Sequence, residues 1–384
     1  MTLAGQDFTV VGAGIAGLAV ATALARAGAA VRVAEKAEAI SEVGAGIQIT
    51  PNGMAVLAAL GLEKACLARG VRAEGVRLRD YRAGAGVLRL DFDRRRHSNP
   101  HPYVFLHRAD LITILAEAAD AAGVRFDLGL ELSPEEALAH SGGMVIGADG
   151  LRSAMRAALN GEAEPFFTGQ VAWRMLVPTD PAEAPPPVAQ VWLGPGRHAV
   201  TYPVRGGRAL NIVAVEERHS WVAEGWSHRD DPETLREAFA DFAPELRTWL
   251  ERAREVYVWG LFRHEVARRW HGDGIAILGD AAHPTLPFLA QGANMALEDA
   301  WVLAKALGAA GGDRAAALAA YQAARVPRVS RVVDAANRNA RVYHLSNPLG
   351  RRATHAAMRL GGAVMPGFAL GQFDWVYGED VTRP

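Results

Sequence analysis

The sequence predicts an α/β protein in which a Rossmann-like nucleotide-binding domain is combined with a mostly antiparallel β-sheet domain and a helical C-terminal region. Three observations lead to this fold class. Residues 8–35 carry the pattern of a strand, a glycine-rich turn, a helix and a second strand, which is how a parallel sheet begins. Residues 165–263 contain short alternating segments typical of antiparallel strands. Residues 323–341 have a helical pattern rich in arginine.

The bulk composition limits the function classes. The 384 residues suit two domains, and 41 Lys and Arg against 42 Asp and Glu leave a net charge of −1, so no overall field attracts nucleic acid or a membrane. The one cysteine, Cys66, excludes an internal disulfide and a thiolate zinc site; it fits a buried apolar position in a cytoplasmic protein. The uncharged run 8–25 is not read as a signal peptide or membrane span, because no basic residue precedes it and glycines interrupt it at fixed offsets.

The first motif is Gly-Ala-Gly-Ile-Ala-Gly at 12–17, which matches GxGxxG after an apolar strand and at the start of a helix. Gly12 permits the tight turn, Gly14 lets the backbone approach a pyrophosphate, and Gly17 lets helix and strand pack closely. Glu35 ends the second strand, where its carboxylate can accept a hydrogen bond from a ribose hydroxyl. This context predicts an adenine dinucleotide site, but the motif alone does not separate NAD from FAD.

The nucleotide-binding domain is expected to be assembled from three separate parts of the chain. A helix at 107–122 and a strand at 144–146 continue it after a two-stranded excursion, and a strand at 275–278 followed by a helix at 292–308 completes it. The expected boundaries are 1–71, 100–164 and 265–322 for the nucleotide-binding domain, 72–99 and 165–264 for the substrate domain, and 323–384 for the helical C-terminal region.

A second motif distinguishes the cofactor. Gly-Asp-Ala-Ala-His-Pro at 279–284 follows the strand at 275–278, and Gln-Gly-Ala-Asn at 291–294 opens a helix. A helix that begins with glycine presents free backbone N–H groups and the positive end of the helix dipole. Reduced flavin carries negative charge around N1 and the C2 carbonyl, so such a terminus would stabilise it. An ordinary structural helix start would give the same pattern.

Taken together, these motifs resemble those of the single-component FAD-dependent aromatic hydroxylases, the flavoprotein monooxygenases that include salicylate, 3-hydroxybenzoate and 6-hydroxynicotinate hydroxylases. The resemblance runs from Gly12 to 373–375 and includes Ala-Asp-Gly-Leu-Arg-Ser at 148–153. It implies FAD as cofactor, NADH or NADPH and O2 as co-substrates, and hydroxylation of a small hydroxylated or carboxylated aromatic compound through a flavin C4a-hydroperoxide. The cofactor-binding residues that follow from the motifs and the resemblance are Gly12, Gly14, Gly17, Glu35, Lys36, Gly46, Gln48, Arg108, Asp149, Asp280, Gln291, Gly292, Ala293 and Asn294.

The substrate side is predicted from the middle sheet. His198 and Tyr202 lie four residues apart on one expected strand, so both lie on the same face, and they match a histidine and a tyrosine that face the substrate in the resembled family. Removing a phenol proton activates the ring, and a histidine suits that base role; a packed histidine is the alternative. Trp173 and Arg174 could offer an aromatic wall and a carboxylate partner, with a core aromatic and a surface arginine as the alternative. Pro287 stands where some relatives carry a polar substrate-contacting residue, which leaves the hydroxylated position open.

Other readings stay open at this point. A flavin oxidase or epoxidase of the same fold, acting on a larger ring, is the alternative enzyme, and a flavin-binding protein without catalysis is the alternative of another class. His97 and His101 predict no metal site, because Asn99 and Pro100 between them interrupt any helix. The arginine-rich helix at 325–341 is compatible with a homodimer and equally with a solvated charged face.

Overall fold

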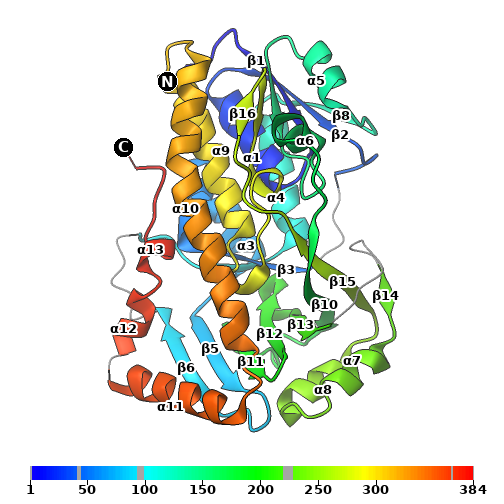
Figure 1. Ribbon diagram of the computed structural model, residues 1–384, viewed down its shortest axis with the longest axis vertical. Coiled ribbons are helices and arrows are strands. Elements are labelled where there is room, and N and C mark those ends of the chain that lie inside the picture. The colour runs from blue at the N-terminus through cyan, green and yellow to red at the C-terminus, as the bar shows by residue number, and fades with distance from the viewer. Residues whose placement is uncertain (1, 41–44, 93–98, 219–227, 365, 384) are drawn as a thin grey trace.

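The architecture combines two large sheets with one long helix that runs beside both. The computed structural model describes residues 2–40, 45–92, 99–218, 228–364 and 366–383. A parallel sheet with its helices occupies the upper part of Figure 1, an eight-stranded sheet lies below it, and α10 (Arg314–Tyr343) passes alongside both. This arrangement confirms the predicted fold class.

The upper sheet is parallel except at one edge, where β16 pairs with β17 in the antiparallel sense. Its central strands β1 and β9 are almost completely buried, as expected for a parallel sheet covered by helices on both faces. The six strands lie in the order β16 (His271–Gly272), β17 (Ile275–Ile277), β9 (Met144–Gly147), β1 (Asp7–Val11), β2 (Ala30–Glu35) and β8 (Arg125–Leu128).

Helices from distant parts of the chain complete this nucleotide-binding part. The apolar sides of α1, α4 and α9 share one core with the sheet, and the side chain of Cys66 lies in the same core, fully buried. The helices of this part are α1 (Ile15–Arg26), α2 (Pro51–Ala59), α3 (Glu63–Arg69), α4 (Arg108–Ala121), α5 (Pro134–His140), α6 (Ala154–Asn160) and α9 (Gly292–Ala309).

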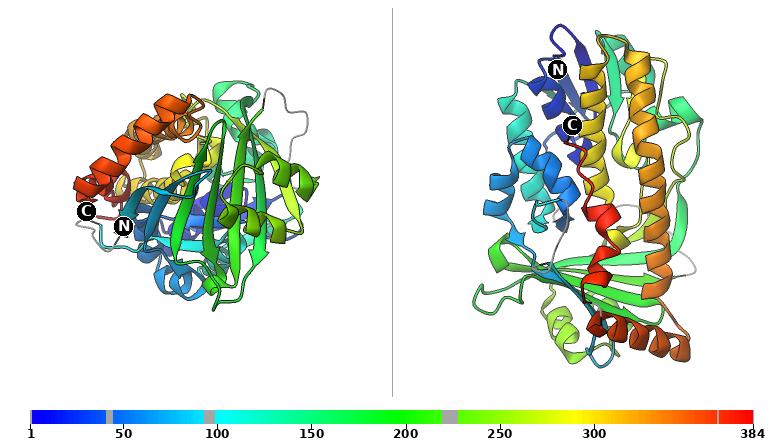
Figure 2. Two further views of the ribbon diagram at one scale, coloured as in Figure 1. Left: turned by 90° about the horizontal axis from the view of Figure 1, so that it is seen from below. Right: turned by 90° about the vertical axis from the view of Figure 1, so that its left-hand side faces the viewer.

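The lower sheet is antiparallel except where β11 pairs with β5 in parallel. Figure 2 (right) shows it edge-on, with α9 and α10 on its upper side. The strands lie in the order β14 (Arg229–Asp230), β15 (Val256–Arg263), β10 (Phe166–Pro178), β13 (Ala209–Glu217), β12 (Arg197–Val204), β11 (Val188–Gly194), β5 (Gly75–Asp80) and β6 (Gly86–Asp91). One face packs on α7 (Pro232–Ala238) and α8 (Pro244–Arg252), and the other is turned toward the nucleotide-binding part.

A small third sheet bridges the two parts. It has the order β3-β7-β4, and β7 pairs with both neighbours in the antiparallel sense. Neither β3 nor β7 was expected from the sequence as a strand of its own. The bounds are β3 (Gly46–Ile49), β7 (Val104–His107) and β4 (Val71–Arg72).

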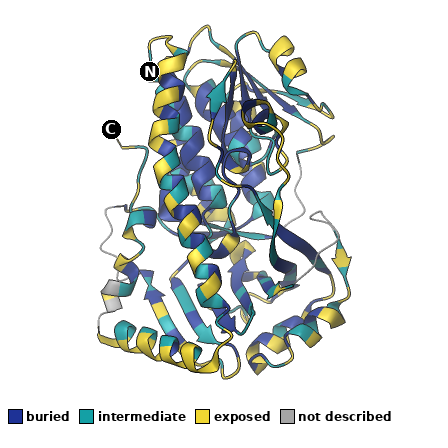
Figure 3. Ribbon diagram, in the orientation of Figure 1, coloured by how far each residue is buried: buried dark blue, intermediate teal, exposed yellow. Residues whose placement is uncertain are grey.

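The C-terminal region is helical, as predicted, but α10 is longer than the expected 323–341. It begins at the N-cap Asp313, whose side chain accepts a hydrogen bond from the Ala316 N–H, and continues through Pro327 to Tyr343. The next helix, α11, is largely exposed (Figure 3). The remaining helices are α11 (Pro348–Val364), α12 (Pro366–Gly371) and α13 (Asp374–Tyr377), and no helix among the described residues is long and apolar enough to cross a membrane.

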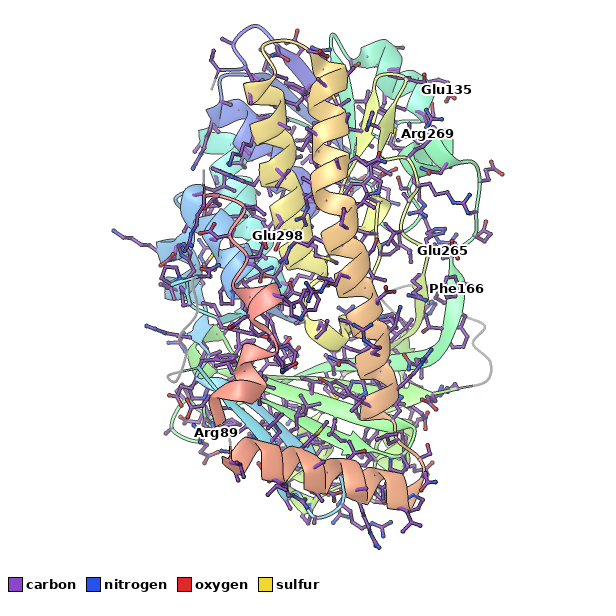
Figure 4. The ribbon with its side chains drawn as sticks, turned by 60° about the vertical axis from the view of Figure 1, so that its left-hand side comes forward. Arg89, Glu135, Phe166, Glu265, Arg269 and Glu298 are labelled. Carbon is purple, nitrogen blue, oxygen red and sulfur yellow. The ribbon has the colours of Figure 1, made fainter. Side chains whose placement is uncertain are left out.

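Two neighbouring carboxylates on α9 form the centre of a buried ion network. Glu298 lies inside the molecule between α9 and the N-terminal helices (Figure 4), and its side chain is fully buried, as is that of Asp299. Arg325 on α10 is 2.7 Å from a carboxylate oxygen of each, and Arg328 binds both oxygens of Glu298, at 2.6 and 2.7 Å. Burial raises the pKa of each carboxyl, but the nearby cations outweigh it and hold both below their usual range, that of Asp299 at about 2.

The same carboxylates bind the second motif and the start of α2. Asp299 accepts a hydrogen bond from the Gly279 N–H at 3.0 Å and another from His283 Nε2. Glu298 accepts a hydrogen bond from Asn52 Nδ2 at 2.6 Å, which ties α2 to α9. The ion network therefore fixes the loop after β17, the start of α2 and the middle of α10 relative to one helix.

Replacing Arg325 with methionine should strongly destabilise the protein, because it leaves two buried carboxylates short of positive charge. We expect the free energy of unfolding to fall by about 3–5 kcal/mol. Urea unfolding followed by circular dichroism measures this. Arg338→Met, at an exposed position of the same helix, is the control and should stay within about 0.5 kcal/mol of the wild type. A similar small change for Arg325→Met would show that the network is not stabilising.

Candidate functional site

The glycine-rich turn has the geometry of a phosphate cradle. Gly12 has φ +103°, and a Cβ on it would lie 2.5 Å from the carbonyl oxygen of Ala148. A Cβ on Gly17 would lie 1.9 Å from the carbonyl oxygen of Gly12, so both positions require glycine for packing. A Cβ on Gly14 would meet no atom within 4 Å. The open space is therefore at Gly14, the position where a pyrophosphate is expected to approach the helix N-terminus.

Glu35 lies beside this turn. Its Oε2 accepts a hydrogen bond from the Ala13 N–H at 2.7 Å, and its Oε1 accepts one from the Ala37 N–H at 2.9 Å. Both hydrogen bonds hold the carboxylate at the end of β2, half-buried, where its remaining lone pairs are available to ribose hydroxyls. Lys36, the next residue, is exposed.

The loop after β17 packs against the start of α1. Residues Gly279–Ala281 form a 3-10 turn, and a Cβ on Gly279 would lie 2.9 Å from the Cβ of Ala16. Asp280 is exposed between these buried neighbours. This contact brings the second motif of the sequence next to the first, although about 260 residues separate them along the chain.

Asp149 lies just before α6, and Arg108 is the first residue of α4. Asp149 accepts hydrogen bonds from Ser153 Oγ at 2.5 Å and from the Met155 N–H at 3.2 Å, and burial raises its pKa despite both. It therefore caps the start of α6, while the preceding Ala148 touches the glycine-rich turn. Arg108 opens α4, and its backbone N–H donates to the Ala45 carbonyl at 2.8 Å, directly before β3.

Strand β3 approaches the lower sheet closely at Gly46. The Gly46 N–H donates to Asn211 Oδ1 at 2.6 Å, and a Cβ on Gly46 would lie 2.6 Å from both the Asn211 side chain and the Tyr202 ring. Two residues on, Gln48 accepts a hydrogen bond from the Tyr103 hydroxyl at 2.6 Å. Burial raises the pKa of Tyr202 more than its hydrogen bond to Gln48 lowers it, so its phenol stays neutral.

The polar side chains at the start of α9 bind protein rather than pointing into open space. Asn294 donates to the Gln48 carbonyl at 3.0 Å and accepts from the Thr50 N–H at 2.9 Å. Gln291 donates to Thr50 Oγ1 at 3.0 Å, and both amides are buried. They clamp β3 against the helix terminus. A Cβ on Gly292 would meet only Thr285, at 3.6 Å, so Gly292 is the position of this terminus with room for another atom.

His198 lies on the face of the lower sheet that is turned toward these segments, and Tyr202 shares that face, as the period-two pattern predicts. The His198 side chain is 2% exposed and packs against Phe288 and Tyr343, with ring centroids 5.1 and 5.4 Å apart. Its Nδ1 is 2.6 Å from Nε2 of His344, the residue after α10. Burial, and then the charge of His344, lower the pKa of His198 well below its usual value.

Trp173 and Arg174 lie on opposite faces of β10, so the structure does not bring both to the site. Trp173 is fully buried against α7 and α8, packs edge-on to Phe239 and donates to Asp230 at 2.7 Å. The predicted aromatic wall at Trp173 does not fit this geometry, because consecutive strand residues point to opposite faces. Arg174 lies on the face of Tyr202, with its guanidinium 4.1 Å from the centroid of Trp259.

Three residues of this face were missed by sequence reasoning. Trp259 comes from β15, Phe288 follows the exposed Pro287 in the 3-10 turn Pro287–Leu289, and His344 follows the long helix. No local signal marks His344, whose contact with His198 spans 146 residues. His97 of the excluded metal pair lies outside the described residues, within which no group of three or more His, Cys, Asp and Glu could hold a metal ion.

Comparison with known proteins gives independent evidence of the family to which the chain belongs. Residues 6–336 match the family model for an FAD binding domain. The chain is 37% identical over 388 residues to 3-amino-4-hydroxybenzoate 2-monooxygenase of Streptomyces cremeus, covering 98% of this chain and 95% of that protein. It is 33% identical over 388 residues to 3-hydroxybenzoate 6-hydroxylase of Klebsiella oxytoca, covering 96% of each. It also superposes with a TM-score of 0.81 on Klebsiella pneumoniae HpxO complexed with FAD and uric acid, at 27% identity over 94% of this chain and 95% of that one.

The open space at Gly14 leads to a test that separates ligand binding from folding. Gly14→Val should leave the thermal stability of the apoprotein unchanged, since a Cβ there meets no protein atom within 4 Å. It should abolish FAD retention, because the side chain would fill the expected pyrophosphate position. Gly86→Val is the matched control: a Cβ on this exposed strand residue also meets nothing within 4 Å. Flavin absorbance after gel filtration measures retention, and a yellow Gly14→Val protein would contradict the placement.

Proposed function

Since the chain belongs to the FAD-binding flavoprotein monooxygenases that act on aromatic compounds, we propose that its substrate is a small phenol bearing a carboxylate, and that His198 is the base that activates it. NADH or NADPH supplies the electrons and O2 the oxygen atom. When bound, FAD supplies the oxygen-transfer chemistry, and the protein orients the ring, excludes water and moves the phenol proton.

The cofactor is proposed to bind along the glycine-rich turn, the loop after β17 and the start of α9. Its pyrophosphate would bind at Gly14, its adenosine ribose at Glu35 and its ribityl chain at Asp280. The flavin ring would lie near Gly46 and the N-terminus of α9, where a Cβ on Gly292 would meet no atom closer than 3.6 Å. The open space at Gly14 and the contact between the loop after β17 and the start of α1 support this assignment.

One observation carries the substrate proposal: a buried histidine, a neutral tyrosine and an arginine share one face of the lower sheet, opposite β3. His198 is held neutral by burial, so it can accept a proton from a phenol. Tyr202 stays protonated and can donate a hydrogen bond to the phenol oxygen. Arg174 provides the positive charge on this face that a benzoate carboxylate would need.

A panel of aromatic acids tests the proposed activity. We expect 3-amino-4-hydroxybenzoate, 3-hydroxybenzoate or 6-hydroxynicotinate to stimulate NAD(P)H consumption and to yield an oxygenated product, detected by mass spectrometry. Benzoate is the control without a phenol and should give no oxygenated product. NAD(P)H consumption that yields only hydrogen peroxide would favour an oxidase, and no turnover with any compound would favour a flavin-binding protein without catalysis.

Replacing the base should slow hydroxylation without releasing the cofactor. For His198→Gln we expect the hydroxylation rate at neutral pH to fall about a hundredfold, because glutamine cannot accept the phenol proton. Product formation is measured by chromatography, and the flavin absorbance of the variant checks that FAD stays bound. Hydroxylation at near the wild-type rate would return His198 to a packing role.

A further inference from the structure

We propose that His344 and Glu217 form a proton path from His198 to bulk water. This inference rests on the proposed role of His198 as the base, and it assigns a function to two residues that do not themselves touch the substrate. The path joins three elements, because His198 lies on β12, His344 follows α10 and Glu217 ends β13.

The three side chains form one continuous hydrogen-bonded chain. His198 Nδ1 is 2.6 Å from His344 Nε2, and His344 Nδ1 is 2.8 Å from Glu217 Oε1. Both histidine side chains are almost completely buried, whereas the Glu217 side chain is 51% exposed. The chain therefore begins at the substrate face and ends at the protein surface.

Backbone hydrogen bonds hold this chain in place. The Gly196 N–H donates to the His344 carbonyl at 3.2 Å, and the Glu217 N–H donates to the Gly196 carbonyl at 2.9 Å. The turn between β11 and β12 thus binds the backbone of both His344 and Glu217. Because the backbone positions are fixed, the side chains keep their hydrogen bonds without ordering a flexible loop.

The hydrogen bonds also set the direction of proton transfer. A carboxylate only accepts, so His344 Nδ1 donates to Glu217, and the neutral His344 ring then offers Nε2 as an acceptor. His198 Nδ1 must donate to that acceptor. The lone pair of the neutral His198 is consequently on Nε2, the ring nitrogen not bound to His344, which is the atom that can take a proton from a substrate.

A path is needed because a buried imidazolium is unfavourable here. Burial, then the charge of His344, lower the pKa of His198 well below its usual value, and burial lowers that of His344 despite the opposing effect of Glu217. The third titratable group in contact, Tyr343, has its pKa raised to about 12 by burial and offers no negative charge. If the proton stayed on His198, the activated phenolate would be short-lived.

The proton shift keeps every buried ring neutral. The substrate O–H bond breaks and a bond forms between that proton and His198 Nε2. The Nδ1 proton of His198 moves to His344 Nε2, the Nδ1 proton of His344 moves to Glu217 Oε1, and Glu217 releases it to water. The same shifts in reverse reset the path when the oxygen of the product recovers its proton, so no net proton or electron is required from elsewhere.

A contrast within the same chain argues against a purely structural histidine pair. His283 also binds a carboxylate, that of Asp299, but both side chains are buried and the carboxylate is held by Arg325. Neither side chain of that pair is exposed to solvent. The Glu217 carboxylate at the end of the His198 path is half exposed, so it can exchange its proton with water.

The experiment follows the proton directly. Oxidised holoenzyme in weak buffer with a pH-indicator dye is mixed in a stopped-flow instrument with the phenol of the panel that the wild type hydroxylates fastest. We expect rapid proton release on binding in the wild type and release at least about tenfold slower in Glu217→Gln and His344→Gln, which corresponds to about 1.4 kcal/mol of barrier. Glu216→Gln, the neighbouring carboxylate that is paired with Arg218, is the matched control and should release the proton at the wild-type rate.

A second variant separates proton transfer from packing. His344→Gly leaves a space of the size of an imidazole ring, and added imidazole should restore fast proton release, which a merely structural defect would not allow. Wild-type rates in both Glu217→Gln and His344→Gln, with proton release lost in His198→Gln, would overturn the path and leave the base assignment intact. Normal hydroxylation by His198→Gln would overturn the base and the path together.

Discussion

The charge pairing between two buried carboxylates on α9 and the arginines of α10 is the constraint on which the site depends. Glu298 and Asp299 are fully buried, and Arg325 contacts both. Through Asp299 the pairing holds the loop that carries Asp280, and through Glu298 and Asn52 it holds the segment after β3. The second motif and the segment after β3 are thus fixed to one helix, and the second motif in turn packs against the start of α1 at Ala16.

The sequence predicts the nucleotide-binding part well because its signals are local. The three glycines, the strand before them and the acid after the second strand each follow from a short-range requirement of backbone geometry. Strand β3 and helix α10 were less predictable. β3 is only four residues long and forms its ladder with β7. Helix α10 runs through Pro327, a residue that normally ends a helix. It is tolerated here where Arg325 and Arg328, before and after it in the sequence, are held by ion pairs to α9.

The candidate site, too, contains residues whose positions follow from local signals and residues whose positions do not. Period-two alternation places His198 and Tyr202 on one face, and the same rule shows why Trp173 and Arg174, adjacent on β10, do not both reach it. Contacts between distant segments are outside such rules. His344 meets His198 only because α10 continues as far as the lower sheet, and Gly46 is required only because Asn211 and Tyr202 of the lower sheet approach β3.

The position of Cys66 affects how such an enzyme withstands oxidative damage during turnover. Flavin-dependent oxygen chemistry that fails to reach its substrate releases hydrogen peroxide beside the polypeptide, and peroxide oxidises thiolates rather than thiols. Cys66 is the one cysteine of the chain; its side chain is completely buried, and burial raises the pKa of its thiol to about 12. The folded protein therefore presents no thiolate to such an oxidant, and folded chains have no exposed cysteine through which a disulfide could cross-link them.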